Sequence, residues 1–249
     1  MTQIDPTRTT DPFERVVEGL DANFGVAPRR RAAHAKGLVA YGTFTPTPEA
    51  RTISRAGHLA GPAVDVVARF SNFPGGASHP DPAPESNPRG LAVQFRLPDG
   101  TTTDLLAHSI EGFPGRTVED FGDFLFAISL GGDGPAGYLA DHPAAAAFVQ
   151  AIGSHGAPVS YATLRYFPVS AFAFHAADGT TRAGRYVFEP IEGVHVLSAT
   201  EAEAADADYL TTELADRLEA DAVVFSLVLA IAEPGDPTDD ANAQWPAER

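Results

Sequence analysis

Apolar residues near the amino terminus recur at helical spacing. Between Phe13 and Leu20 they repeat every three or four positions, with polar residues between them. Asp11 stands where an N-terminal cap is expected, and Gly25 stands where the pattern ends. The sequence therefore predicts a helix between Asp11 and Gly25.

From Gly37 onward the pattern changes to short runs of β-branched and aromatic residues. Gly, Pro and Asn bound these runs, which is typical of strands. Two Asp-Gly turns, at residues 99–100 and 178–179, separate neighbouring runs and predict hairpins. The predicted strands include Gly37–Thr45, Val64–Ser71, Leu91–Leu97, Leu164–His175, Arg182–Pro190 and Ala222–Ala232.

Helical patterns return between the strands. One begins at Thr117, a second covers Pro143–Ile152, and a third, acidic one begins at Thr200 and ends near Leu218. The segment Phe73–Pro88 is a loop by composition, and we interpret it as an insertion within one domain. About seven strands, with helices grouped between them, predict an α+β protein built on an antiparallel sheet or barrel.

The composition limits the class of protein. The chain has 249 residues, 44% of them hydrophobic, which suits a folded protein with a proper core. Its formal net charge of −16 argues against nucleic-acid and anionic-membrane partners, because both require a basic face. The absence of cysteine excludes disulfides and thiolate metal sites. No signal-peptide pattern opens the chain, and the longest apolar run is too short to span a bilayer, so we expect a cytoplasmic protein.

Common catalytic motifs are absent from the sequence or stand in the wrong context. The eight histidines show no HExxH pattern, and there is no GxSxG motif. A GxGxxG match begins at Gly132, but it follows a predicted helix rather than a strand. We therefore interpret it as a loop between helices instead of a dinucleotide site.

The remaining candidate chemistry is a cluster of cations around one histidine. Three arginines, residues 29–31, precede His34 at the start of the first predicted strand. Arg69 and Ser71 alternate on a later strand and therefore share a face. Two interpretations follow: the arginines form ordinary ion pairs, or they hold an anionic ligand beside the histidine.

Several motifs occur along the chain in a distinctive order and spacing. They are HAKG (His34–Gly37), GTF, VARFS (Val67–Ser71), NPRGLAVQF (Asn87–Phe95), TDLLAHS, TVEDFGDFL, the YATLRYFPVSAFAFHAADG hairpin and AEPGDPTDD followed by WP. In this set the chain resembles the heme catalase family, and most of all its small bacterial branch, the catalase-related peroxidases. The resemblance covers nearly the whole chain. It implies a catalase-like antiparallel β-barrel with surrounding helices, holding heme b beside the barrel.

The resemblance also implies roles for individual residues. His34 matches the distal histidine, which moves a proton from one peroxide oxygen to the other so that water leaves. Ser71 matches the serine that hydrogen-bonds this ring and fixes its tautomer. The cofactor-binding residues implied in the same way are Arg31 and Arg69 at the heme propionates, Phe121 against the porphyrin and Phe113 as a second pocket aromatic.

Two departures from the family pattern bear on function. His108 occupies the position of the distal asparagine, and loss of that asparagine favours peroxidase behaviour over rapid dismutation. His108 offers a hydrogen bond in its place and is counted with the catalytic residues. The family's axial tyrosine lies in an Arg-x-x-x-Tyr segment beyond the Trp-Pro pair that matches Trp245-Pro246, whereas this sequence ends at Arg249. None of its six tyrosines lies in such a segment, so the iron ligand is unknown.

We therefore expect residues 1–249 to form a single catalase-like domain, truncated at the C-terminus relative to the family. The expected function is a heme-dependent peroxidase or catalase-related oxidoreductase that uses hydrogen or organic peroxide and a small organic substrate. Its iron is ligated by another residue, or its pocket binds heme weakly or is completed by a partner chain or a second copy in a homodimer. The alternative is a heme-free barrel that acts as a small-molecule-binding or protein-interaction module.

Overall fold

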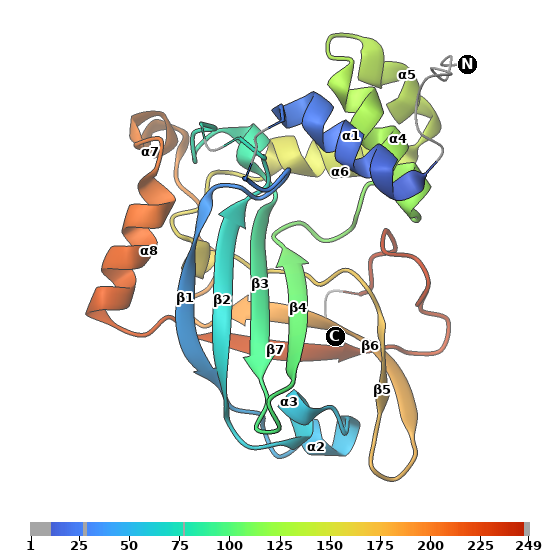
Figure 1. Cartoon of the computed structure of the whole chain (residues 1–249), viewed down its shortest axis with the longest axis vertical. Helices are drawn as coiled ribbons and strands as arrows, with labels where there is room; N and C mark the ends of the chain where they lie inside the picture. Colours follow the sequence, from blue (N-terminus) through green and yellow to red (C-terminus); the bar gives the residue numbers. More distant parts are fainter. Residues whose placement is uncertain (1–10, 27–28, 77, 247–249) are drawn as a thin grey trace.

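The structure, a computed structural model, describes residues 11–26, 29–76 and 78–246. Its helices gather mainly at one end of a sheet system, with α8 along one side (Figure 1). Within the described residues, every helix is too short or too polar to cross a bilayer. The helices are α1 (Pro12–Phe24), α2 (Ala50–Ile53), α3 (Gly57–Ala60), α4 (Val118–Ser129), α5 (Gly134–Asp141), α6 (Pro143–Ser154), α7 (Ala199–Ala204) and α8 (Tyr209–Ala220), with 3₁₀ turns η1 (Pro84–Ser86) and η2 (Tyr161–Thr163).

Two antiparallel sheets carry the fold. The larger has the order β1-β2-β3-β4, so that each strand pairs with the next one along the chain, and the smaller has the order β5-β6-β7. Isolated bridges from Phe167 to His108 and from Tyr166 to Phe188 connect the two sheets. The strands are β1 (Gly37–Phe44), β2 (Val64–Asn72), β3 (Arg89–Arg96), β4 (Thr102–His108), β5 (Phe172–His175), β6 (Thr181–Pro190) and β7 (Phe225–Ile231).

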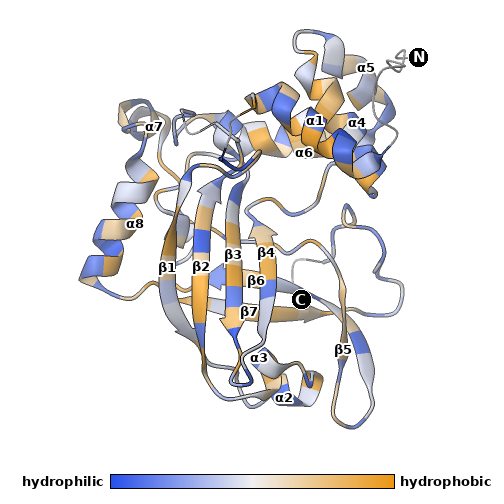
Figure 2. Ribbon diagram, in the orientation of Figure 1, coloured by the Kyte–Doolittle hydropathy of each residue, from blue (hydrophilic) through white to orange (hydrophobic). Residues whose placement is uncertain are grey.

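The main hydrophobic core is formed by the inner faces of the sheets together with α8. Side chains alternate along each strand, so Phe70 and Phe95 point inward and are 4% and 1% exposed. On the opposite face of the larger sheet, Tyr41 is 78% exposed and Leu106 is 72% exposed. Figure 2 shows apolar residues along these strands. A second core joins α1, α4 and α6 around Leu125 at the end of the larger sheet.

The predicted α+β class with antiparallel strands and surrounding helices is confirmed. The first helix begins after Asp11, whose carboxylate accepts hydrogen bonds from two backbone N–H groups, and it ends at Gly25, where φ is 78°. The GxGxxG match begins in the predicted loop, between α4 and α5, but its second and third glycines lie within α5. The hairpins and the strand near the C-terminus are also present, although β7 is shorter than the predicted Ala222–Ala232.

Two predictions of local structure were wrong. The strand predicted over Leu164–His175 is confined to β5, because its first half makes only isolated bridges. The acidic helix predicted from Thr200 to Leu218 is two helices, and its cap is Ser198, whose hydroxyl accepts from the Glu201 backbone N–H. Both errors arise where hydrogen bonds between distant segments override a local pattern.

Candidate functional site

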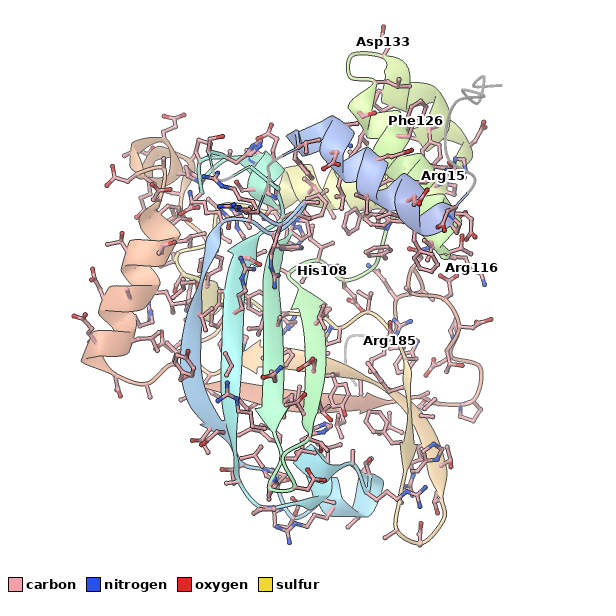
Figure 3. The ribbon with its side chains drawn as sticks, viewed as in Figure 1. Arg15, His108, Arg116, Phe126, Asp133 and Arg185 are labelled. Atoms are coloured by element: carbon pink, nitrogen blue, oxygen red, sulfur yellow. The ribbon has the colours of Figure 1, made fainter. Side chains whose placement is uncertain are left out.

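A row of four residues crosses the end of the larger sheet that faces the helices. Gly37 on β1 pairs with Ser71 on β2, which pairs with Gly90 on β3, which in turn pairs with His108 on β4. Residues paired directly in an antiparallel sheet place their side chains on the same face. The side chains of Ser71 and His108 therefore share a face, with a glycine between them. Figure 3 shows His108 at the end of β4, below the helices in this view.

His34 lies in the loop before β1, with its ring against this row. Its Nδ1 is 3.0 Å from the Ser71 hydroxyl oxygen. Its φ of 55° lies in the left-handed region, which is uncommon for a residue other than glycine. Two backbone hydrogen bonds hold this conformation: the His34 N–H donates to the Phe73 carbonyl at 2.7 Å, and its carbonyl accepts from Arg69 Nη2 at 2.6 Å. Bonds from two other segments thus fix both the backbone and the ring of His34.

Gly90 provides the space that the ring occupies. A Cβ at this position would lie 2.8 Å from His34 Nδ1, 2.8 Å from the Ser71 hydroxyl oxygen and 2.9 Å from His34 Cε1. These separations are too short for nonbonded atoms, so any side chain would displace the His34–Ser71 pair. Glycine is therefore required on β3 because the histidine approaches the strand backbone so closely.

Two arginines surround His34 with positive charge. Burial of the ring, with the guanidinium groups of Arg69 and Arg31, lowers the pKa of His34 to about 4. Burial and the neighbouring Arg31 also lower the pKa of Arg69. Among the described residues, neither guanidinium has an ion pair with a carboxylate. At neutral pH the site therefore holds a neutral imidazole beside two cations that are available to an anion.

His108, the last residue of the row, has a buried ring N–H group that can donate a hydrogen bond. Its Nδ1 accepts a long hydrogen bond of 3.4 Å from the Ile110 N–H, which leaves the ring proton on Nε2 in the neutral form. Nε2 is buried and has no partner among the described residues. Burial, with a smaller effect from His34, lowers the pKa of His108 to about 4. A buried N–H without a partner is costly in a folded protein, so this donor is available to an oxygen acceptor.

Aromatic rings lie between the row and the helical core. The Phe113 ring centroid is 6.2 Å from that of His108 and 4.8 Å from that of Phe121 on α4. Phe148 on α6 approaches His108 edge-on, with its centroid at 6.0 Å. The site thus combines polar groups on the sheet with an apolar wall from the helices.

The structure brings together residues that the sequence analysis named separately. His34, Ser71, Arg31 and Arg69 form one cluster, and His108 lies one strand beyond Gly90, with Phe113 and Phe121 behind it. The role of Gly90 was not predicted, although a glycine inside a strand pattern is a signal of close backbone approach. Among the described residues, no group of three or more His, Cys, Asp or Glu could hold a metal ion.

Comparison with known proteins shows which family this chain resembles. The family described as "Catalase" matches residues 27–239. The chain is 39% identical over 236 residues to a catalase-related peroxidase of Mycolicibacterium paratuberculosis, covering 93% of this chain and 75% of the relative. It is 33% identical over 246 residues to a catalase-related peroxidase of Synechococcus elongatus, covering 95% of this chain and 71% of the relative. It is also 27% identical to catalase B of Emericella nidulans over 207 residues, which cover 76% of this chain and 28% of the relative.

Both the family match and the two relatives above 30% identity span most of the chain. The matched region contains every residue of the row and of the His34 cluster. The chain therefore belongs to the catalase family, as a small member with peroxide-related oxidoreductases among its relatives.

Proposed function

We propose that this protein is a heme-dependent peroxidase that reduces hydrogen or organic peroxide and oxidises a small organic substrate. The observation that carries the proposal is the His34–Ser71 pair, held against Gly90 beside two arginines without carboxylate partners. A heme-free barrel has no evident use for this combination of a neutral imidazole and unpaired cations.

The residues present fit a heme group. Gly90 leaves the space in which the His34 ring lies, and His108 Nε2 is a buried donor without a partner among the described residues. Arg31 and Arg69 supply two positive charges next to each other, as two propionates require. Phe113 and Phe121 supply an apolar surface of the kind that a porphyrin contacts.

When bound, heme supplies the iron-based oxidation and reduction that amino-acid side chains do not provide. The chain contributes binding and proton transfer. Arg31 and Arg69 would hold the propionates, and Phe113 and Phe121 would contact the ring. Arg69 also binds the His34 carbonyl, so a propionate at this guanidinium would be linked directly to the loop that carries the histidine.

His34 is the proposed acid and base. Its lowered pKa keeps the ring neutral at pH 7. With Nδ1–H donating to Ser71, Nε2 has a free lone pair and can accept the proton of a peroxide. The protonated ring then returns this proton to the departing oxygen as the O–O bond breaks, so that this oxygen leaves as water or an alcohol; bound heme would supply the two electrons that the cleavage requires. Because the two arginines disfavour the imidazolium, the ring returns the proton readily.

His108 is proposed to steady the substrate oxygen. Its Nε2–H can donate one hydrogen bond, where the asparagine of the family pattern offers an amide. We infer that this replacement favours peroxidase turnover over dismutation. Another residue of this protein, or one from a partner chain, would ligate the iron.

The absorption spectrum and iron content of the purified protein, produced with ample heme precursor, test the proposal. A Soret band with near-stoichiometric iron, followed by peroxide-dependent oxidation of a phenolic dye, is the expected result. A colourless protein that does not take up added heme would overturn it. That outcome would favour the alternative, a heme-free barrel that binds a small molecule or another protein.

A further inference from the structure

Asp81 lies in the loop between β2 and β3 and is fully buried, with 0% of its surface exposed. Its Oδ1 accepts from Asn72 Nδ2 at 2.6 Å and lies 2.7 Å from Lys36 Nζ. Its Oδ2 accepts from the Leu210 N–H at 2.9 Å, and its carbonyl accepts from Arg89 Nη2 at 2.5 Å. One carboxylate and one carbonyl therefore connect three strands with the start of α8.

Three of the residues that Asp81 binds are direct neighbours of the row at the site, and they lie at or just before the ends of β1, β2 and β3. Lys36 precedes Gly37, Asn72 follows Ser71, and Arg89 precedes Gly90. Because successive side chains in a strand point to opposite faces, the side chains of Asn72 and Arg89 leave the sheet on the face opposite Ser71. Asp81 thus binds the ends of β1, β2 and β3 on one face of the sheet, while His34 lies on the other face, beside Ser71.

Backbone hydrogen bonds transmit this constraint to the site. The Asn72 N–H donates to the Lys36 carbonyl at 3.0 Å, two residues after His34. The Arg89 N–H donates to the Ser109 hydroxyl at 2.9 Å, next to His108. A small shift at these strand ends would change the spacing between His34, Ser71 and the Gly90 cradle.

We propose that Asp81 is a positioning residue for the His34–Ser71 pair and acts through the ends of three strands. The inference rests on the proposed function only where turnover is concerned, because the geometry of His34 can be measured without heme. Asp81 is not a catalytic residue, since its contacts are with Lys36, Asn72, Arg89 and Leu210 rather than with the reacting groups.

The test compares Asp81→Asn with the matched control Asp208→Asn. Asp208 Oδ1 lies 2.6 Å from the same Lys36 ammonium, but its side chain is 75% exposed. Both variants remove one negative charge next to Lys36, whereas only the first disturbs the links to Asn72 and Leu210. The measurement is the ¹⁵N spectrum of the His34 imidazole in the heme-free chain across a pH titration, with thermal unfolding in parallel.

In Asp81→Asn we expect altered His34 nitrogen shifts and a pKa of His34 closer to its ordinary value, because the ring loses its fixed contact with the strand. Asp208→Asn should leave both unchanged. In the heme-loaded enzyme, kcat should fall roughly 10- to 100-fold with little change in KM, as expected for misplacement of a reacting group. A folded Asp81→Asn protein with an unchanged His34 spectrum would overturn the proposal.

Lys36→Met serves as the second variant if Asp81→Asn does not fold. It keeps the aliphatic stem and the backbone carbonyl of Lys36 but removes the ammonium that binds Asp81. A smaller change in the same His34 signals supports the proposal, and no change contradicts it. If the wild-type protein shows no peroxide turnover, the proposed function fails, while the heme-free spectra still decide the role of Asp81.

Discussion

Histidines at opposite ends of the larger sheet share a lowered pKa for different reasons. At the helix end, burial and two guanidinium groups lower the pKa of His34 to about 4. At the other end, burial alone lowers the pKa of His58 on α3 to about 4. His58 is 3% exposed, bonds Tyr186 through Nε2 at 3.1 Å and lies against Phe95, with ring centroids 4.8 Å apart.

The comparison shows that a shifted pKa does not by itself identify a functional site. His58 has no neighbouring charge that contributes to its shift, and an aromatic core surrounds it. His34 lies beside two unpaired cations and a cradle shaped by a missing side chain. The first arrangement offers an anion no cation, although His58 Nδ1 is also buried without a partner among the described residues, whereas the second suits an anionic ligand and proton transfer.

The largest effect is expected on peroxide-dependent oxidation, which substitution of His34 should lower and substitution of His58 should affect only through stability. His34→Ala should lower peroxide-dependent oxidation by roughly 100- to 10,000-fold, as expected for loss of an acid–base group. Heme content and the unfolding temperature should change little. His58→Ala should instead destabilise the fold by about 2–4 kcal/mol through a buried cavity and an unpaired Tyr186 hydroxyl. Steady-state kinetics and denaturant unfolding of both variants check this pair, and turnover that survives in His34→Ala would show that the distal assignment is wrong.

A smaller effect on turnover is expected when a side chain fills the space at Gly90 in which the His34 ring lies. Gly90→Ala places a Cβ within 2.8 Å of His34 Nδ1 and of the Ser71 hydroxyl oxygen, so the pair must separate. We expect turnover to fall roughly 10- to 100-fold. Gly42→Ala is the matched control on β1, because its Cβ would meet only Val66 Cγ2, at 3.7 Å. Equal activity in the two folded variants, measured with the same peroxide, would contradict the role of Gly90.

The pH dependence of stability should report three buried histidines, His34, His58 and His108. Each has a pKa of about 4 in the folded protein, lower than in the unfolded chain, so the unfolded chain binds more protons between about pH 6.5 and pH 4. The free energy of unfolding should therefore decrease as the pH falls through this window, with His58 contributing on the order of 2–3 kcal/mol. His58→Gln removes this contribution, and urea titrations at several pH values should show a shallower decrease. If the free energy of unfolding of His58→Gln fell with pH as steeply as that of the wild-type protein, His58 would not contribute to the decrease.

The smallest expected effect is a change in the pKa of His34 that leaves the pKa of His58 unchanged. Arg69→Gln removes a guanidinium that disfavours the His34 imidazolium, so the pKa of His34 should rise. The pKa of His58 should stay the same, because burial alone lowers it. A ring-proton titration of the heme-free variant follows both residues at once. A change at His58, or none at His34, would count against this division.

The sequence by itself determined much of this protein. Local patterns predicted α1 with its Asp11 cap, the β3–β4 hairpin and the α+β class, because caps, turns and side-chain alternation act over a few residues. The order of short motifs also identified the family and named His34, Ser71 and Arg69, which the structure brings into one cluster.

Tertiary structure decided the rest. The predicted acidic helix is broken before α8 because Asp81 and Lys36 bind the Ala207 carbonyl and Asp81 accepts from Leu210, and these partners are distant in sequence. The requirement for Gly90 follows from a histidine more than fifty residues earlier in the chain, which rests against its backbone. The unpartnered Nε2 of His108 depends on which atoms surround it after folding. Local propensity carries no information about such contacts, because they exist only after the strands and loops have packed together.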